Sequence, residues 1–194
     1  MEIKGRVCHL KRLFDLVLAV ILLVVLLPLM CLIILCIKID SKGPSIFKQR
    51  RIGMNKKEFY IYKFRTMKID TPDLATHLID HSKYVTRVGK LLRKTSLDEL
   101  PQLINIIKGD MSFVGPRPAL YNQYDLIELR EKKGVHKVRP GITGYAQVNG
   151  RDDLSNEEKV YWDSLYVESY SFLTDIKIIL KTIKTLVNTR SIKG

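Results

Sequence analysis

The sequence predicts an α+β protein that is mainly helical, with an N-terminal re-entrant membrane helix, a small β-hairpin and amphipathic interfacial helices. Three features support this: an uncharged apolar run over residues 16–37, two β-rich stretches within residues 45–66, and later segments with helical apolar periodicity. The chain has 194 residues, the length of one ordinary domain. We therefore expect a membrane-embedded segment over residues 1–40 and a domain on the membrane face over residues 41–194.

The apolar run indicates that the strong positive charge of the chain faces a membrane rather than nucleic acid. The chain has 33 Lys and Arg against 20 Asp and Glu, a formal net charge of +13, which is typical of proteins that contact nucleic acid or an anionic membrane. About 20 apolar residues suffice to cross a bilayer, and this run is longer. A signal peptide is the competing interpretation, but no A-x-A-like cleavage site follows the run. The odd count of cysteines argues against a secreted disulfide scaffold.

The flanks of the run and Pro28 predict a helix that enters and leaves the membrane on one side. Basic residues precede the run (Lys4, Arg6, Lys11, Arg12) and follow it (Lys38, Lys42, Lys48, Arg50, Arg51). Such residues stay on the cytoplasmic side, so both ends favour the same side. Pro28 removes a backbone hydrogen bond and favours a break in the middle. The alternative is a kinked helix that spans the membrane, because proline is tolerated there.

The first part of the domain combines a hairpin with short helices. Residues 45–52 and 58–66 predict two strands around a turn at residues 53–56, and residues 85–93 predict a short basic helix. Ser96 opens an S-x-x-E capping box, so we expect the next helix to begin there and to end at Gly109.

The C-terminal part predicts two further helices. A second capping box, led by Ser155, begins a helix that carries Trp162 and Tyr166. Residues 173–187 form an apolar stripe opposite lysines. That last helix either packs in the core or lies on the membrane surface.

Asp98 and Glu99, the acidic pair, lie in a basic neighbourhood. Several basic residues precede the pair without an intervening acid, and Arg117 follows it. Acids in a first helical turn complement the helix dipole, so capping alone could explain them. The helix start and the cations also favour the ionised carboxylate, the form needed for nucleophilic attack or for holding Mg²⁺. Arg117 and Arg139 lie beside prolines, and this rigidity suits oxyanion clamps.

Two segments then make the sequence recognisable. RVGKLLRKTSLDELPQLINIIKGDMSFVGPRP and, further on, VRPGITGYAQVNGR resemble the bacterial sugar transferases, specifically the small monotopic phosphoglycosyl transferases. The resemblance runs from about residue 11 to about residue 184. It implies transfer of a sugar 1-phosphate from a UDP-sugar to polyprenyl phosphate, usually undecaprenyl phosphate, with release of UMP and a requirement for Mg²⁺. It also implies the cytoplasmic face of the bacterial inner membrane, where the chain would begin glycoconjugate assembly ahead of downstream glycosyltransferases.

The resemblance assigns roles to individual residues. Asp98 matches the nucleophile that forms a covalent phosphosugar intermediate, and the acidic pair would also hold Mg²⁺. The residues that match phosphate-binding positions are Lys63, Arg93 and Arg117. The signature segment assigned to nucleotide-sugar binding contains Gln147, Asn149 and Arg151. The family often has Ser before the proline of the membrane helix, whereas this chain has Leu27, so the bend here would rest on Pro28 and packing.

Two alternatives come from other functional classes. A membrane-anchored protein that binds nucleic acid would explain the net charge, but no nucleic-acid motif accompanies it, so we expect no nucleic-acid partner. A catalytically silent subunit of a glycan-assembly machine would explain the resemblance, but the intact acidic pair argues against it. The sequence leaves open which UDP-sugar is used, which glycan pathway is served and which oligomer forms.

Overall fold

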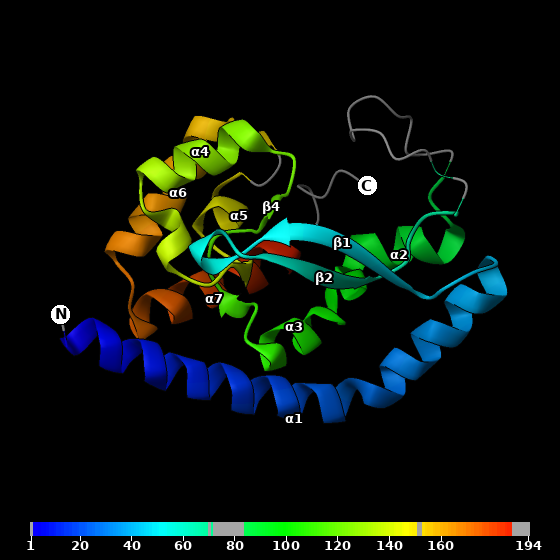
Figure 1. Cartoon of the computed structure of the whole chain (residues 1–194). Helices are drawn as coiled ribbons and strands as arrows, with labels where there is room; N and C mark the ends of the chain where they lie inside the picture. Colours follow the sequence, from blue (N-terminus) through cyan, green and yellow to red (C-terminus); the bar gives the residue numbers. More distant parts are fainter. Residues whose placement is uncertain (1, 70, 72–83, 151–152, 188–194) are drawn as a thin grey trace.

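Helix α1 (Glu2–Asp40) runs along the lower edge of the molecule in Figure 1 and bends in its second half. The computed structural model describes residues 2–69, 71, 84–150 and 153–187. Pro28 lies inside α1, and the helix is continuous across it. The expected helix–break–helix is therefore a single bent helix. A proline removes one helical hydrogen bond and crowds the preceding turn, which is sufficient to bend a helix without ending it.

The predicted hairpin is confirmed and belongs to a three-stranded sheet. Strands β1 (Ile46–Ile52) and β2 (Glu58–Phe64) pair antiparallel, and β4 (Ala119–Leu120) pairs with the other edge of β1. The hairpin turn contains a short 3₁₀ helix, Met54–Lys56. A separate two-stranded parallel sheet joins β3 (Ser112–Val114) to β5 (Gly141–Thr143).

Helices make up most of the remaining described structure. They are α2 (Arg87–Thr95), α3 (Gln102–Lys108), α4 (Tyr124–Lys132), α5 (Tyr145–Asn149), α6 (Asn156–Glu168) and α7 (Phe172–Val187). Two predicted caps are confirmed. Ser155 and Glu158 form the capping box of α6, and Gly109 ends α3 with a left-handed φ of 90°, a conformation that glycine adopts without steric cost.

The predicted capping box at Ser96 is wrong. Ser96 has a left-handed φ of 57°, makes no side-chain cap, and ends α2 by donating its N–H to the carbonyl of Arg93. The acidic pair then lies in a single 3₁₀ turn, Leu97–Glu99. Pro101 is the N-cap of α3. Pro101 has no N–H to donate to the carbonyl of Leu97, and its ring crowds that carbonyl. The Leu97 carbonyl instead accepts from the N–H of Leu100 in the tighter 3₁₀ pattern, so the predicted continuous α-helix from Ser96 to Gly109 does not form.

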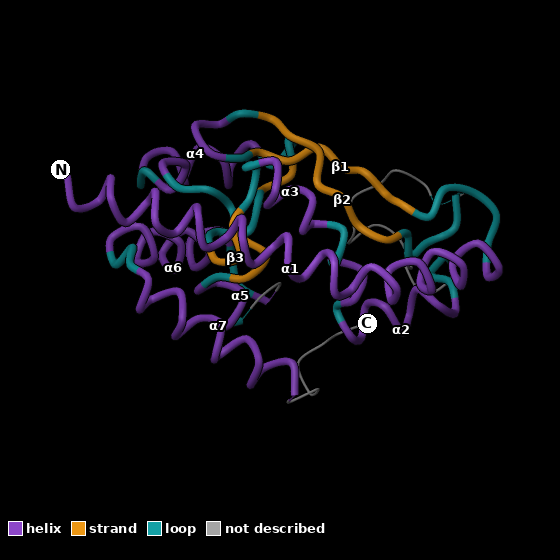
Figure 2. Tube along the Cα trace, turned by 90° about the horizontal axis from the view of Figure 1, so that it is seen from below, coloured by secondary structure: helices purple, strands orange, loops and turns teal. Residues whose placement is uncertain are grey.

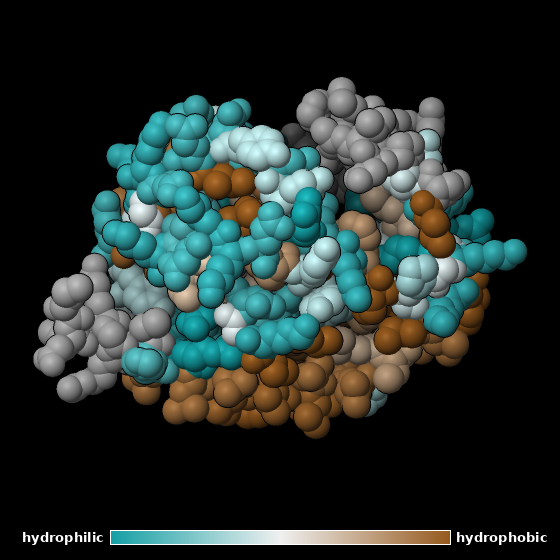
Figure 3. Space-filling model, in the orientation of Figure 1, coloured by the Kyte–Doolittle hydropathy of each residue, from teal (hydrophilic) through white to brown (hydrophobic). Residues whose placement is uncertain are grey.

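One face of α1 packs against the domain, and the other is apolar and exposed. Ala19 packs with Ile61 and Ile106, and residues further along α1 pack against Phe64 and Leu92. The outer face exposes large apolar side chains along its length: Leu10, Leu13, Val17, Ile21, Val24, Val25, Leu32, Leu35 and Ile39. They form the brown lower surface in Figure 3. Residues 9–40 of α1 are long and apolar enough to cross a membrane.

Helix α7 extends this exposed apolar surface. Figure 2 looks up at the molecule from the side of α1 and shows α7 running at an angle to it. The rings of Phe14 and Phe172 meet edge to face, with centroids 5.2 Å apart. Beyond this contact, α7 exposes Leu173, Leu180 and Ile183, while Ile178 is buried in the core. The last helix therefore has a core-packed side and an exposed apolar side.

Gly89 sets the distance between α2 and the end of β2. A Cβ at this position would lie 2.1 Å from the carbonyl oxygen of Thr66, which is a backbone atom. We expect Gly89→Ala to destabilise the protein by about 1–3 kcal/mol, the usual cost of overpacking. Leu91→Ala, an exposed change on the same helix, is the matched control. Thermal unfolding of both variants in nanodiscs checks this, and equal midpoints for Gly89→Ala and wild type would contradict the tight contact.

Candidate active site

The acidic pair lies where α2, α3 and β2 meet. The 3₁₀ turn that carries the pair follows the left-handed Ser96, which reverses the chain after α2. Lys63, near the end of β2, reaches this turn. The structure therefore brings together residues far apart in the sequence that the resemblance had assigned to one site.

Glu99 holds the closest ionic contacts of the site. Lys63 Nζ lies 2.7 Å and Arg117 Nη2 lies 3.2 Å from Glu99 Oε1. Burial alone would raise the pKa of Glu99, but the charges and hydrogen bonds of Arg117 and Lys63 outweigh it and lower the pKa to about 2. Glu99 is thus ionised and held in place by two cations.

Asp98 is less tightly paired. Within the described residues, its closest ion-pair contact is with Lys63, whose Nζ lies 3.9 Å from Asp98 Oδ2. Burial raises the pKa of Asp98 above its ordinary value, and Lys63 acts in the opposite direction. The sequence prediction that a helix start would favour its ionised form is wrong, because Asp98 begins no α-helix. The cations instead engage mainly Glu99, which leaves Asp98 as the more basic carboxylate of the pair.

Arg93 belongs to the Asp98 side of the site. Its Nε donates to Thr66 Oγ1 at 3.0 Å. Its charge lowers the pKa of Asp98 and, in return, Asp98 raises the pKa of Arg93 against the effect of burial. Lys63, Arg93 and Arg117, which the resemblance assigned to phosphate binding, therefore lie around the acidic pair. Thr66, which contacts Arg93, was not named from the sequence.

Asn105 fixes the strand that carries Lys63. Its side chain is fully buried and bridges α3 to β2: Oδ1 accepts from the N–H of Tyr62 at 3.0 Å, and Nδ2 donates to the carbonyl of Tyr60 at 2.7 Å. A buried amide needs hydrogen-bond partners. An asparagine among the apolar positions of a predicted helix therefore indicates such a contact, and this signal was not used in the sequence prediction.

The loop over residues 115–118, the GPRP loop, is held through its backbone. Arg130 Nη1 donates to the carbonyl of Arg117 at 2.8 Å, and Arg51 Nη1 donates to the carbonyl of Pro118 at 2.9 Å. The N–H of Gly141 donates to the carbonyl of Pro116. From the sequence, Arg51 was placed only among the basic residues that flank the apolar run, and Arg130 was assigned no role. Both donate here to backbone carbonyls, which every residue has, so no sequence pattern marks these contacts.

The signature segment lies apart from these contacts. Gln147 and Asn149 are on α5, and Arg151 falls outside the described residues. Asn149 Nδ2 donates to the carbonyl of Tyr145 at 2.9 Å. Gln147 is buried, and neither of its amide atoms has a hydrogen-bond partner within the described part of the chain. In the part of the chain that the structure describes, no hydrogen bond or ion pair joins these two side chains to the acidic pair.

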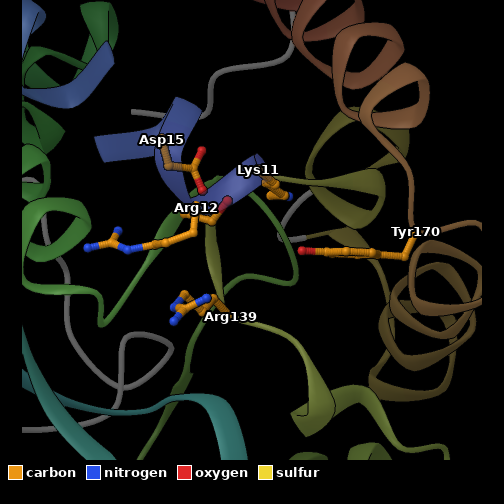
Figure 4. A pocket seen from close by; sticks show the side chains of 6 residues that line it. Lys11, Arg12, Asp15, Arg139 and Tyr170 are labelled. Atoms are coloured by element: carbon orange, nitrogen blue, oxygen red, sulfur yellow. The ribbon is translucent and has the colours of Figure 1, made fainter. Parts of the chain in front are cut away.

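A second polar cluster fastens α1 to the domain (Figure 4). Lys11 Nζ lies 2.7 Å from Asp175 Oδ2 and donates to the carbonyl of Val114 at 2.8 Å. Arg12 and Arg139 donate to backbone carbonyls at the C-terminal end of α3. Arg139 was expected to suit an oxyanion clamp. The structure instead places it beside Arg12, where it holds backbone.

The carboxylates of the site could supply part of a magnesium site. Within residues 2–69, 71, 84–150 and 153–187, no group of three or more His, Cys, Asp or Glu side chains is arranged to hold a metal. Mg²⁺ is commonly bound by one or two carboxylates together with water and substrate phosphates. Among the described residues, the closest ion-pair partner of Asp98 lies 3.9 Å away, so Asp98 fits such a shared site better than Glu99 does.

Comparisons with known proteins identify the family of the chain. The family described as Bacterial sugar transferase matches residues 6–189. The uncharacterized sugar transferase EpsL of Bacillus subtilis is 42% identical, covering 95% of this chain and 90% of the relative. A Caulobacter vibrioides UDP-glucose:undecaprenyl-phosphate glucose-1-phosphate transferase is 40% identical over 92% of this chain and 70% of the relative.

A longer relative shows the same similarity. The Escherichia coli UDP-glucose:undecaprenyl-phosphate glucose-1-phosphate transferase is 46% identical over 92% of this chain, which spans 40% of that protein's length. The match thus extends over nearly the whole chain, from the first turns of α1 to the end of α7. The chain belongs to the bacterial sugar transferase family.

Proposed function

We propose that this chain transfers a sugar 1-phosphate from a UDP-sugar to a polyprenyl phosphate, such as undecaprenyl phosphate, and releases UMP. The observation that carries the proposal is the acidic pair, held by Lys63 and Arg117 next to a helix with an exposed apolar face. The names of the Caulobacter and Escherichia relatives describe this reaction for glucose. In this role the chain begins assembly of a lipid-linked glycan, which downstream glycosyltransferases extend.

Asp98 is the proposed nucleophile. Its carboxylate oxygen attacks the sugar-bearing phosphorus, a phosphorus–oxygen bond forms, and the bond to the UMP oxygen breaks, with its electron pair leaving on UMP. A phosphate oxygen of the lipid then attacks the same phosphorus and regenerates the carboxylate. Asp98 suits this role better than Glu99, since Glu99 is engaged by two cations and has a pKa of about 2.

The cations around the acidic pair would neutralise the substrate's diphosphate. Two anionic groups repel each other strongly in a partly dry site, so a carboxylate needs nearby positive charge to approach phosphorus. Arg117 and Arg93 each present a planar fork that matches phosphate oxygens. Lys63 contributes a point charge between the two carboxylates.

We also propose that Mg²⁺ binds here with the substrate. Asp98 and Glu99 would supply protein oxygens, and the diphosphate and water would complete the coordination. The ion would withdraw charge from the phosphate oxygens. Gln147, Asn149 and Arg151 are assigned to nucleotide-sugar binding, a role supported by the unpartnered amide of Gln147, whose donor and acceptor suit a polar ligand.

The membrane helix is proposed to enter and leave on the cytoplasmic face. Both ends of α1 are fastened to the same domain: Lys11 donates to Val114, and at the other end Arg65 donates to the carbonyls of Ser41 and Lys42. A helix that crossed the bilayer would carry its two ends to opposite sides. The exposed apolar residues of α7, which meet α1 at Phe172, suit a helix lying in the same interface.

Cysteine labelling tests this topology. In a background with the native cysteines replaced by serine, single cysteines at Lys4 and Lys42 are both expected to be protected from a membrane-impermeant thiol reagent in intact cells. Both should label after the cells are permeabilised, which serves as the internal control. Labelling of the position 4 cysteine alone in intact cells would mean that α1 spans the membrane.

A UMP-release assay tests the function itself. The full chain in nanodiscs is mixed with Mg²⁺, undecaprenyl phosphate and, one at a time, UDP-glucose, UDP-galactose and UDP-N-acetylhexosamines. We expect one or a few of these sugars to give UMP together with a lipid-linked sugar diphosphate. Absence of UMP from an extended panel that includes UDP-diamino sugars would overturn the proposed activity.

A further inference from the structure

A buried ion pair lies behind the GPRP loop. Arg130 of α4 and Asp163 of α6 have side chains that are only 4% and 1% exposed. Arg130 donates through Nε and Nη2 to the same oxygen, Asp163 Oδ2, at 3.0 and 2.6 Å. Its remaining nitrogen, Nη1, donates to the backbone carbonyl of Arg117 at 2.8 Å. The guanidinium therefore connects α6 to the loop that carries Arg117.

Stability alone does not account for a charged pair at this position. The two charges lose their hydration on burial, and well-packed apolar residues of similar volume are often as stable or more stable. The apolar neighbours Ala119, Leu126 and Val160 already hold α4 and α6 together. What an apolar pair could not provide is a hydrogen-bond donor for the carbonyl of Arg117.

The backbone contact matters because the Arg117 side chain is partly open to solvent. That side chain is 41% exposed, and its Nη2 lies 3.2 Å from Glu99 Oε1. A long, solvated side chain holds its guanidinium in a defined position only if its backbone is fixed. Movement of the Arg117 backbone would add to the spread of guanidinium positions, and catalysis depends on precise placement of such groups.

We propose that Arg130, oriented by Asp163, is a positioning residue that holds Arg117 in place for the diphosphate. The inference rests on the proposed function, because it takes Arg117 as a phosphate-binding side chain. Asp163 fixes the Arg130 guanidinium, Arg130 fixes the Arg117 carbonyl, and Arg117 thereby keeps its place beside Glu99. Neither Arg130 nor Asp163 contacts the reacting atoms.

The test separates positioning from stability. The variant Arg130→Met/Asp163→Leu replaces the ion pair by apolar side chains, which is expected to preserve the unfolding midpoint while removing the donor to Arg117. We expect kcat/KM for the UDP-sugar to fall about tenfold. Val160→Ala, which weakens the same α4–α6 packing without touching the guanidinium, is the matched control and should lower the midpoint more than it lowers kcat/KM.

A mutant cycle with Arg117→Ala tests whether Arg130 and Asp163 affect kcat/KM through Arg117. If Arg130 acts through Arg117, the double replacement should cause little further loss of kcat/KM in the Arg117→Ala background, since coupled residues are not additive. A full additional tenfold loss there would overturn the inference, as would wild-type kcat/KM for Arg130→Met/Asp163→Leu. Should that variant not fold, Arg130→Lys, which retains the charge but cannot make all three contacts, is measured in both backgrounds instead.

Hydrogen exchange gives a readout that does not depend on activity. Amides in residues 112–120 should exchange faster in the Arg130→Met/Asp163→Leu variant than in wild type or Val160→Ala, because the loop has lost one of its anchors. Unchanged exchange in this segment would contradict the positioning role even if activity fell. A wild-type chain that releases no UMP would contradict the proposed function, and the exchange experiment would still decide whether Arg130 holds the loop.

Discussion

Asp98→Asn is expected to abolish UMP release and the covalent phosphosugar adduct, with a loss of at least about 1,000-fold in kcat. Asparagine keeps the size of the side chain but has no anionic oxygen to attack phosphorus. Intact-protein mass spectrometry after mixing the enzyme with Mg²⁺ and the UDP-sugar, without lipid, measures the adduct directly. Wild type should gain the mass of a sugar phosphate under these conditions, together with a burst of UMP.

Glu99→Gln separates the two carboxylates. Because Glu99 is engaged by Lys63 and Arg117, its loss should slow turnover but still permit formation of the adduct on Asp98. Asp125→Asn, an exposed change at the start of α4, is the matched control and should behave as wild type. If wild type turns over with lipid present but gives neither adduct nor UMP burst without it, the transfer is direct and Asp98 is not the nucleophile.

Local signals in the sequence predicted the elements that depend on short-range chemistry. The β1–β2 hairpin, the capping box at Ser155 and the glycine C-cap at Gly109 all appear in the structure, because each is set by residues within a few positions. The segment around Ser96 was predicted incorrectly. The S-x-x-E pattern fits a capping box, but Ser96 ends α2 in a left-handed conformation. Pro101 cannot donate to the carbonyl of Leu97, and that carbonyl closes a 3₁₀ turn with Leu100 instead.

The sequence indicated which basic residues lie near the acidic pair, but not which carboxylate each of them contacts. Family motifs identified Lys63, Arg93 and Arg117, and the structure places all three around the acidic pair. Which carboxylate receives which cation depends on the relative placement of β2, the GPRP loop and the 3₁₀ turn, and no sequence spacing encodes it. The supporting side chains Asn105 and Arg130 act on distant backbone carbonyls and N–H groups, so they are visible only once the chain is folded.

Lys63→Met is expected to lower kcat/KM about 100-fold, comparable to the loss of one donor that stabilises charge in a transition state. Lys63 lies near both carboxylates, with its Nζ 2.7 Å from Glu99 Oε1 and 3.9 Å from Asp98 Oδ2. Without it the diphosphate meets two carboxylates with less compensating charge. Lys56→Met, on the exposed hairpin turn where the ammonium pairs with Glu131, is the control and should leave kcat/KM unchanged.

The pH dependence of kcat/KM gives a second test of the effect of Lys63 on Asp98. Asp98 attacks only as the carboxylate, so kcat/KM should rise with pH as Asp98 loses its proton. Burial raises the pKa of Asp98 and the positive charge of Lys63 lowers it. Removing that charge must therefore raise this pKa further, and the acid limb of the profile should move to higher pH in Lys63→Met. In wild type Glu99 has a pKa of about 2, so its titration lies below this limb. Loss of Lys63 also removes part of what lowers the pKa of Glu99, so the same profiles measured in the Glu99→Gln background assign the limb to Asp98.

Lys63→Arg tests whether charge is the cause. The arginine keeps the positive charge but changes its geometry, so kcat/KM should fall while the acid limb stays near that of wild type. Profiles of kcat/KM for wild type, Lys63→Met and Lys63→Arg, measured from about pH 4 to pH 8 with circular dichroism to verify folding, provide the comparison. An acid limb that is the same in all three, or that moves to lower pH in Lys63→Met, would contradict the assignment of the limb to Asp98 and of its shift to Lys63.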